Sequence, residues 1–353
     1  MFASLNHHLA IDSILTGITP GRVFVDDPKK PRTAVAWFKR RVFLAGNRSD
    51  PEINEALNDL FSHAYYPEMK TSSLGQSAFT LVYTPGWERV MDSVLAGKDP
   101  MRGQRLYYRL DPSKQKWQVR IPKEYALRWV DAALLADDSL SNLDYVTNEM
   151  ISERPSIDDF LEKSFGVCVI HGHEIVAWCM TEYNIGGRCE LGVDTARDHQ
   201  RLGLAMATAS ATMREAARRD YTEIGWVCDA DNKPSMALAR ELGFSLQCAD
   251  DTYFAFFDPQ LNLGLNGNIQ LRQQNYQEAA MWYEQALLHP NPPIWLLWNT
   301  AIVWANLGNQ ANTFTYLNKM IDAGFTDKPF LTTSEHFRIY HRSAEWAALL
   351  ARL

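Results

Sequence analysis

The sequence predicts a mixed α/β protein that continues into an all-α region. Strand patterns rich in Val and Phe alternate with helical patterns in residues 1–116. Residues 117–258 show a strand meander, then strand, helix, strand and helix, and a closing hairpin, which is a mixed α/β order. After Asp258 and Pro259 only helical periodicity remains, in residues 262–353. A chain of 353 residues commonly holds two or three domains, and these three segments are the domains expected.

Four strands and two helices are expected in the first segment. The turn residues Asp27, Pro28 and Pro31 separate the first two strands, and Gly97 ends the second helix. The segment shows no catalytic motif and closes in a polar linker, Asp111–Lys116. The expected strands are Arg22–Asp26, Ala34–Ala45, Ala78–Tyr83 and Arg105–Leu110, and the expected helices are Glu52–Ala64 and Trp87–Ala96.

The second segment is expected to alternate strands and helices between two hairpins. His171–Gly172–His173 joins the strands of the first hairpin, and Gly243 stops the last helix. The expected strands are Gln118–Ile121, Val167–Ile170, Glu174–Glu182, Arg188–Val193, Glu223–Cys228, Phe244–Cys248 and Thr252–Phe257. The expected helices are Ala126–Leu135, Ile157–Lys163, Ala205–Arg219 and Ser235–Leu242.

Composition and charge narrow the class of function. Hydrophobic residues make up 46% of the chain, no apolar run approaches the ~18 residues of a membrane span, and Met1–Ser13 lacks a secretory signal pattern. The five cysteines form no CxxC pair, so reduced, mostly buried thiols in a cytoplasmic protein are expected. Residues 117–261 carry 13 Lys and Arg against 24 Asp and Glu. That balance argues against nucleic acid and favours a cationic substrate, unless the acidity is only a solvated surface.

The turn Gln200–Ala205, between a strand and a helix, suits a phosphate group. The strand Arg188–Val193 precedes it and the helix follows directly. Unpaired N–H groups and the helix dipole favour an anion at such a place, Gly203 permits close backbone approach, and Arg201 adds charge. Taken alone, a QxxGxA turn is commonly only a helix start, and the sequence has no GxGxxG dinucleotide motif.

A second stretch supports the phosphate interpretation. Asn232 fits an N-cap, and Pro234 fits the first turn of the helix that follows. The two stretches together, within residues 117–258, resemble the GCN5-related N-acetyltransferase (GNAT) superfamily. In that family a Q/R-x-x-G-x-G/A turn binds the coenzyme A pyrophosphate, and an N-x-x-S/A segment ending in Gly-Phe lies along the pantetheine arm. The matching residues are Gln200, Gly203 and Ala205 in the first motif, and Asn232, Ser235, Leu238, Gly243 and Phe244 in the second.

The resemblance implies a GNAT-type acetyltransferase domain. Such a domain would move an acetyl group from acetyl-CoA, its co-substrate, directly to the amine of a small molecule, and the acidity of residues 117–261 favours a cationic one. No further residues with metal-ligand spacing accompany the turn histidines, so no metal is expected. The residues expected to bind the cofactor are Val193, Gln200, Arg201, Leu202, Gly203, Leu204, Ala205, Asn232 and Ser235.

Glu190 is the expected general base, because the family often places its base on the strand before the phosphate turn. Partial burial would raise the pKa of Glu190 toward neutrality, and a solvent-facing carboxylate is the alternative. Glu182, His171, His173 and Asp229 are weaker candidates. Many family members carry a tyrosine after the position of Leu238 as general acid, but this chain has Ala239. The acid is therefore unidentified, with Tyr253 and Cys228 as candidates.

The flanking segments suggest accessory roles. Residues 1–116 resemble the degenerate copy of the fold that precedes the active copy in some GNAT enzymes. Residues 262–353 resemble tetratricopeptide repeats, first over Asn275–Pro290 and then, more loosely, over Trp295–Ile321. Two helix pairs bury little by themselves, so this unit is expected to pack on the enzyme body, a partner protein or a second copy. The alternative function is a non-catalytic protein that binds coenzyme A or a metabolite while the repeats recruit a partner, which Ala239 supports.

Overall fold

The computed structural model describes residues 1–48, 50–71 and 77–353. These residues form two compact units, one from residues 1–96 and 102–254 and the other from residues 97–101 and 255–353. The predicted boundary at residue 116 lies inside the first unit, because residues on both sides of it contribute strands to one sheet. The linker predicted at Asp111–Lys116 contains one 3-10 turn, Pro112–Lys114.

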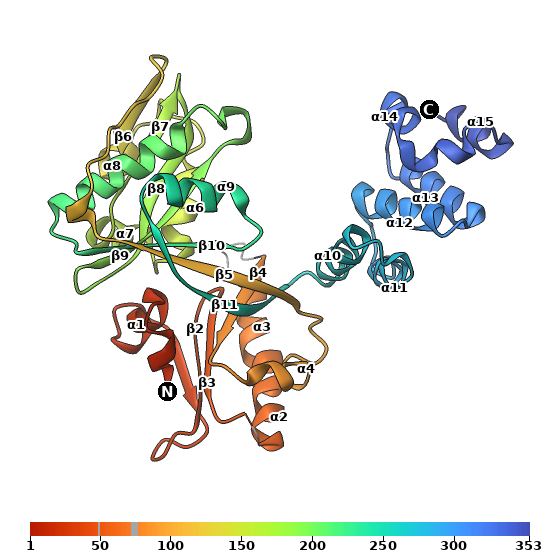
Figure 1. Ribbon diagram of the computed structural model, residues 1–353. Helices are drawn as coiled ribbons and strands as arrows, with labels where there is room; N and C mark the ends of the chain where they lie inside the picture. Colours follow the sequence, from red (N-terminus) through yellow and green to blue (C-terminus); the bar gives the residue numbers. More distant parts are fainter. Residues whose placement is uncertain (49, 72–76) are drawn as a thin grey trace. The chain divides into compact units, whose positions relative to one another are not determined.

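Eleven strands of the described chain form one sheet, in the order β1-β2-β3-β4-β11-β5-β10-β9-β8-β7-β6 (Figure 1). β5 comes from the first predicted segment and pairs antiparallel with β10 from the second, from Leu110 opposite Ile224 to Arg105 opposite Asp229. β11 lies between β4 and β5, so the last strand joins the two halves of the sheet. The strands are β1 (Arg22–Val25), β2 (Thr33–Phe38), β3 (Arg41–Gly46), β4 (Ala78–Tyr83), β5 (Met101–Leu110), β6 (Tyr125–Trp129), β7 (Gly166–His171), β8 (Glu174–Ile185), β9 (Arg188–Thr195), β10 (Glu223–Asp229) and β11 (Ser245–Phe256).

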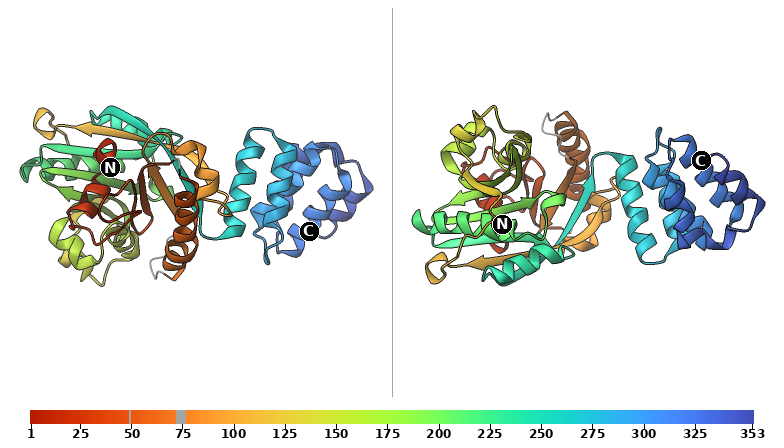
Figure 2. Two further views of the ribbon diagram at one scale, coloured as in Figure 1. Left: turned by 90° about the horizontal axis from the view of Figure 1, so that it is seen from below. Right: turned by 90° about the horizontal axis from the view of Figure 1, so that it is seen from above.

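Helices cover both faces of the part of the sheet that holds β7 to β10 (Figures 1 and 2). On one face Cys179 and Leu191 pack in an apolar cluster with residues of α8 and α9. On the other face Trp178 and Met180 pack with residues of α6 and α7, as the alternation of side chains along a strand requires. The helices of this unit are α1 (Leu9–Leu15), α2 (Pro51–Leu60), α3 (Tyr66–Thr71), α4 (Met91–Val94), α5 (Ala132–Leu135), α6 (Asp144–Ser152), α7 (Ile157–Lys163), α8 (Leu204–Arg218) and α9 (Lys233–Glu241).

The second unit is helical, and its helices pack in sequential pairs, α10 with α11 and α12 with α13 (Figure 2). Two glycines of α10 allow close packing: an added Cβ would lie 2.6 Å from Trp295 at Gly264 and 2.4 Å from Tyr283 at Gly267. None of the helices in the described ranges combines the length and apolar character that a membrane span requires. The helices are α10 (Pro259–Arg272), α11 (Tyr276–Ala286), α12 (Ile294–Asn306), α13 (Gln310–Asp322), α14 (Lys328–Thr333) and α15 (Ala344–Leu350).

Two expectations around residues 118–135 are wrong. The described chain has no strand at Gln118–Ile121, and the predicted helix Ala126–Leu135 is divided into the strand β6 and the short helix α5. β6 pairs with β7, from Tyr125 opposite His171 to Trp129 opposite Val167, and this pairing overrides the local helical pattern. α5 then starts anew at Asp131, whose side chain accepts a hydrogen bond from the Leu134 amide at 2.9 Å.

Three other elements differ from the prediction. The single strand predicted at Ala34–Ala45 is the hairpin of β2 and β3, which turns at Lys39 with a φ of +49°. The hairpin predicted from Phe244 to Phe257 is one continuous strand, β11. Asp250 lies in the expected turn but is held by His7 and His8, whose Nε2 atoms lie 2.5 and 2.8 Å from its Oδ2. The helix predicted at Trp87–Ala96 is a 3-10 turn followed by α4.

Candidate active site

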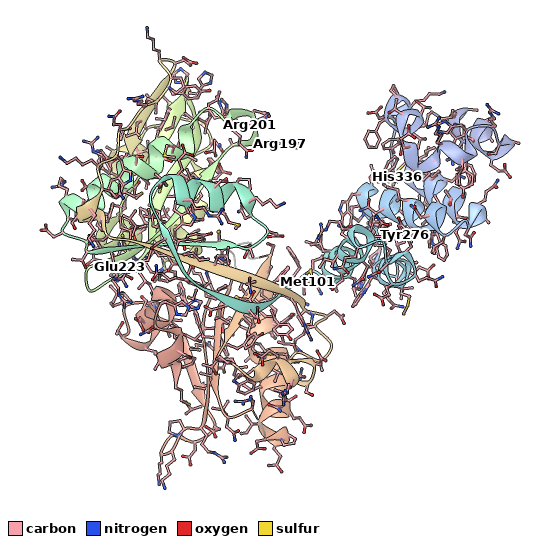
Figure 3. The ribbon with its side chains drawn as sticks, in the orientation of Figure 1. Met101, Arg197, Arg201, Glu223, Tyr276 and His336 are labelled. Atoms are coloured by element: carbon pink, nitrogen blue, oxygen red, sulfur yellow. The ribbon has the colours of Figure 1, made fainter. Side chains whose placement is uncertain are left out.

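The turn before α8 presents backbone N–H groups to solvent. Gly203 precedes the helix with a φ of +78°, and an added Cβ there would meet nothing within 4 Å. The side-chain Nε2 of Gln200 donates to the Thr195 carbonyl at 3.1 Å, which ties the turn to the end of β9. Among the described residues no side chain caps α8, so its first N–H groups remain available to an acceptor. Arg197 and Arg201 lie on this exposed segment (Figure 3).

Asn232 and Ser235 are fixed by hydrogen bonds at the start of α9. The Asn232 side chain accepts from the Ser235 amide at 3.1 Å and so caps the helix, as its sequence position predicts. The Ser235 hydroxyl accepts from the Trp226 indole Nε1 at 3.0 Å. Ala239, at the position where many family members have tyrosine, is fully buried in the apolar cluster of α8 and α9.

The parallel strands β9 and β10 pair over only part of their length. Their register runs from Arg188 opposite Glu223 to Leu191 opposite Trp226, although β9 continues to Thr195 and β10 to Asp229. A cavity of about 320 Å³ lies beyond the paired part. Its lining includes Gly192, Val193, Cys228, Asp229, Asn232 and Ser235. The structure therefore brings Val193, Asn232 and Ser235 together, whereas residues 200–205 do not line this cavity.

Two carboxylates converge over Gly192 in this cavity. A Cβ at residue 192 would lie 2.5 Å from Glu182 Oε1 and 3.1 Å from Glu149 Oε1. Burial, and then repulsion from Glu182 and Glu153, raises the pKa of Glu149 to about 8. Burial and Glu153 also raise the pKa of Glu182. Glu182 was a weaker candidate from the sequence, and Glu149 was missed because nothing local to α6 marks it as a site residue.

Glu190 lies on β9 two residues before Gly192 and is only 7% exposed. The interpretation of Glu190 as a solvent-facing carboxylate is therefore wrong. It lines a separate cavity of about 230 Å³ together with His7 and Tyr107. Burial, and then repulsion from Glu182, raises the pKa of Glu190 to about 8.

The weaker candidates for the base are separated by the structure. His171 and His173 are exposed on the turn between β7 and β8, and neither lines either cavity. Asp229 lines the 320 Å³ cavity, where it forms an ion pair with Arg105 at 3.3 Å. Of the two candidates for the general acid, Cys228 lines that cavity. Tyr253 does not, and its ring packs 5.7 Å from that of Tyr83.

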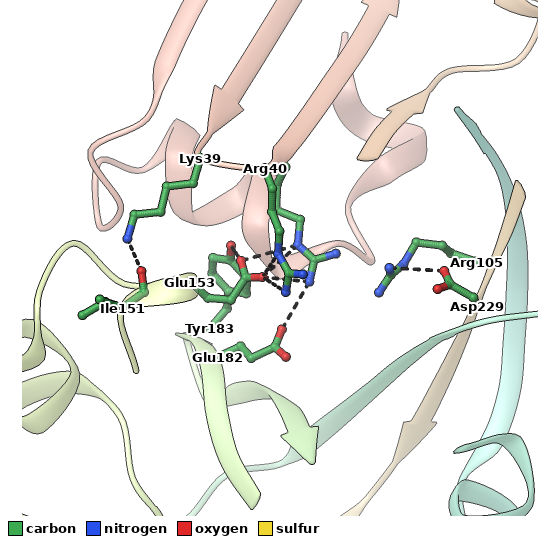
Figure 4. A network of polar contacts seen from close by, with 9 residues as sticks. Lys39, Arg40, Arg105, Ile151, Glu153, Glu182, Tyr183 and Asp229 are labelled. Atoms are coloured by element: carbon green, nitrogen blue, oxygen red, sulfur yellow. Dashed lines mark hydrogen bonds and ion pairs between the residues drawn. The ribbon is translucent and has the colours of Figure 1, made fainter. Parts of the chain in front are cut away.

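A buried ion network supports the cavity from the side of β2 and β3 (Figure 4). Arg40 Nη2 and Arg41 Nη2 lie 2.7 and 3.0 Å from Glu153 Oε1, and the Tyr183 hydroxyl donates to Glu153 Oε2 at 2.5 Å. Arg41 also approaches Glu182 at 3.6 Å. Although burial opposes ionisation, Arg41, Arg40 and the Tyr183 hydroxyl hold the pKa of Glu153 at about 2. Arg40 and Glu153 are more than 100 positions apart in sequence, so no local sequence pattern predicts this network.

Replacing Glu153 with Gln should destabilise the protein by about 3–5 kcal/mol, because the mostly buried Arg41 and the partly exposed Arg40 lose the buried counterion that they share. The pKa of Glu153 lies below its ordinary value of 4.5. Its contribution to stability is therefore present above pH 4.5 and lost as the pH falls toward 2. Chemical unfolding at pH 7 would measure the loss. Asp137→Gln removes the partly exposed ion pair with Arg128 and should change stability by less than about 1 kcal/mol. An equal effect of the two variants would contradict this account.

A second polar cluster joins the first residues of the chain to β5 and β11. His8 Nδ1 contacts the Tyr107 hydroxyl, and burial lowers the pKa of His8 to about 4. Hydrogen bonds from His7 and His8 outweigh burial and keep the pKa of Asp250 well below its ordinary range. His7, Cys248 and Asp250 also place potential metal-ligand atoms within 4.8 Å of one another. Sequence spacing missed this cluster, because its members lie more than 240 residues apart.

The features of this site are those of an acyltransferase. Parallel strands diverge beside a helix start with available N–H groups, and carboxylates lie at the divergence. A profile of the GNAT acetyltransferase family matches residues 1–253. The chain therefore belongs to the GNAT acetyltransferase family and is a GNAT-type acyltransferase. The match covers both halves of the eleven-stranded sheet and stops before the helical unit.

One relative in sequence and one solved structure are similar to this chain, the second in fold alone. The chain is 26% identical over 245 residues to the uncharacterized N-acetyltransferase YdfB of Bacillus subtilis strain 168, covering 69% of this chain and 88% of YdfB. Its fold is similar to that of a GCN5-related N-acetyltransferase-like protein from Streptococcus suis 89/1591, with a TM-score of 0.52 and 21% identity. That alignment covers 70% of this chain and 92% of the other.

Proposed function

We propose that the chain transfers an acetyl group from acetyl-CoA to the primary amine of a small molecule, by direct attack within a ternary complex. The observation that carries the proposal is the divergence of β9 and β10, where Gly192, Asn232 and Ser235 border one cavity and carboxylates converge. In this proposal the coenzyme A phosphates bind Gln200–Ala205 and the start of α8. The pantetheine arm lies along Val193, Asn232 and Ser235.

Transfer requires that the amine lose a proton as it attacks. We propose Glu190 as the base. It lies on the same face of β9 as Gly192 and interacts with Glu182, Arg41 and Arg105 of the 320 Å³ cavity. Its pKa of about 8 is near the working pH at which general bases are most effective. The thiolate of coenzyme A must then gain a proton. Cys228 lines the 320 Å³ cavity and Tyr253 does not, so Cys228 is the better placed candidate for the proton donor.

Calorimetric titration with acetyl-CoA, followed by measurement of thiol release with a panel of amines, tests the proposal. Saturable binding and amine-dependent release are expected. A folded protein that neither binds acetyl-CoA nor releases thiol with any amine would refute it.

The charge of the residues that line the cavity differs from the charge of the whole segment. The net acidity of residues 117–261 predicts a cationic acceptor, but three arginines, Arg40, Arg41 and Arg105, line the same cavity as the carboxylates. We still propose that the amino group of the acceptor binds as a cation. The role predicted for the helical unit, binding a partner protein or a second copy through a tetratricopeptide-like surface, stays a prediction.

A further inference from the structure

Arg105 lines the 320 Å³ cavity and forms an ion pair there with Asp229. Its side chain is 14% exposed, and its Nη1 lies 3.3 Å from Asp229 Oδ1. Asp229 is itself 62% exposed, so this ion pair is weakly held. The Nε of Arg105 is buried and has no hydrogen-bond partner within the part of the chain that the structure describes. A buried polar group without a partner costs about 1–3 kcal/mol. Because Asp229 is mostly exposed, the carboxylate of a ligand in the cavity can take its place beside the Arg105 guanidinium.

Two carboxyl groups line the same cavity as Arg105. Arg105 lies on β5 and Glu182 on β8 of the one sheet, and both side chains line the cavity (Figure 4). Glu149 forms no ion pair with any described residue, although its carboxylate and that of Glu182 approach each other over Gly192. Arg40 and Arg41 both engage Glu153, and Arg41 also lies 3.6 Å from Glu182. Burial raises the pKa of Glu149 to about 8. An ammonium group beside Glu149 would therefore stabilise its ionised form.

One kind of ligand satisfies both ends of the cavity. A carboxylate accepts hydrogen bonds from a guanidinium in fixed, paired geometry, and an ammonium group is attracted by converging carboxylates. We propose that the acceptor is a small amino acid, whose carboxylate binds Arg105 and whose amino group lies between Glu149 and Glu182 above Gly192. This inference rests on the proposed function and names its substrate class.

The reaction then balances without a further reactant. The bound ammonium first loses one proton, through a carboxylate of the site, to solvent. The free amine then forms a bond to the acetyl carbon, the bond from that carbon to sulfur breaks, the nitrogen gives up a second proton, and the thiolate takes up one. The products are an N-acetylamino acid, coenzyme A and one proton. A cavity of about 320 Å³ lies at the low end of ligand pockets, and in the proposed function the pantetheine arm lies along Val193, Asn232 and Ser235 of the same cavity. The remaining space favours amino acids with short side chains.

Matched acceptors test the substrate class. Thiol release and product mass are measured for several small amino acids and for the carboxamide of each, which keeps the amine and lacks the anion. We expect the KM of the amino acid to be at least about tenfold lower than that of its amide, because the amide loses the charged contact with Arg105. Equal or better use of the amides, or turnover only with amines of another class, would overturn the inference and leave the proposed function standing. Failure to bind acetyl-CoA, with no turnover of any amine, would overturn both.

A variant pair tests the role given to Arg105. Arg105→Gln should raise the KM for the amino acid at least about tenfold and change its kcat less, while the KM for the amide stays the same. Arg105→Lys keeps the positive charge but lacks the paired donors of a guanidinium, so its KM for the amino acid should lie between those of the wild type and Arg105→Gln. It also tests the role of Arg105 if the Gln variant does not fold. Arg128→Gln is the matched control, since it removes another strand arginine from an ion pair, with Asp137 at 2.5 Å. Equal loss for amino acid and amide in Arg105→Gln would show a structural role and overturn the assignment.

Discussion

Gly203→Glu should abolish the binding of acetyl-CoA. Gly203 has a φ of +78°, a conformation that costs a residue with a side chain about 1 kcal/mol or more. The added carboxylate would enter the space in front of the N–H groups of α8, which suits an anion in the wild type. We expect the affinity to fall by at least about 100-fold, which corresponds to roughly 3 kcal/mol of binding free energy. Calorimetric titration would measure the change.

A second glycine separates local backbone strain from loss of the phosphate site. Gly172, in the turn between β7 and β8, also has a positive φ, of +61°, and open space around its Cβ position. Gly172→Glu should therefore carry a similar conformational cost and leave acetyl-CoA affinity unchanged. Unchanged affinity in a folded Gly203→Glu protein would mean that the phosphates bind elsewhere.

Glu190→Gln should lower kcat/KM at neutral pH by roughly 10²- to 10⁴-fold, the usual range for loss of a general base. The pKa of Glu190 is about 8, so the fraction of proton-accepting carboxylate grows as the pH rises toward 8. The wild type should therefore gain activity up to about pH 8, and the variant should lack this part of the profile. The loss should shrink at high pH, where unprotonated amine is abundant.

Burial and the charged groups near Glu190 set its pKa, and therefore the pH at which activity should rise. Glu182 and Glu153 raise its pKa, while Arg41 and Arg105 oppose them. Glu174→Gln, at the exposed start of β8, is a control that should leave the profile unchanged. A loss in Glu190→Gln that is the same at every pH would assign Glu190 a positioning role, and Glu182 would then be the next candidate for the base.

Local signals predicted the elements around the cofactor turn well. The turn at Gly172, the helix after Gly203 and the cap at Asn232 each depend on a few adjacent residues whose conformational preferences are strong. The rest of the site depends on contacts between distant segments. Arg40 and Arg41 meet Glu153, and Arg105 meets Asp229, only because the sheet joins the two halves of the unit.

Long-range contacts also explain where the prediction of elements failed. Asp250 and Asp251 look like a turn in the sequence, since aspartate favours turns. In the structure His7 and His8 bind Asp250, and the segment stays extended as β11. Likewise, pairing with β7 turns part of a helical pattern into β6. Propensity is a weak prior in both places, because it contains no information about the partner strand.

The position of β11 sets an order of events during biosynthesis. β4 and β5 both pair with β11, which the ribosome makes only after residues 111–244. At about 5–20 residues per second, that interval lasts on the order of ten seconds. During it the facing edges of β4 and β5 are unpaired, and open edges invite pairing with other chains. The nascent first half of the unit is therefore expected to be a client for chaperones until Ser245–Phe256 emerges and closes the sheet.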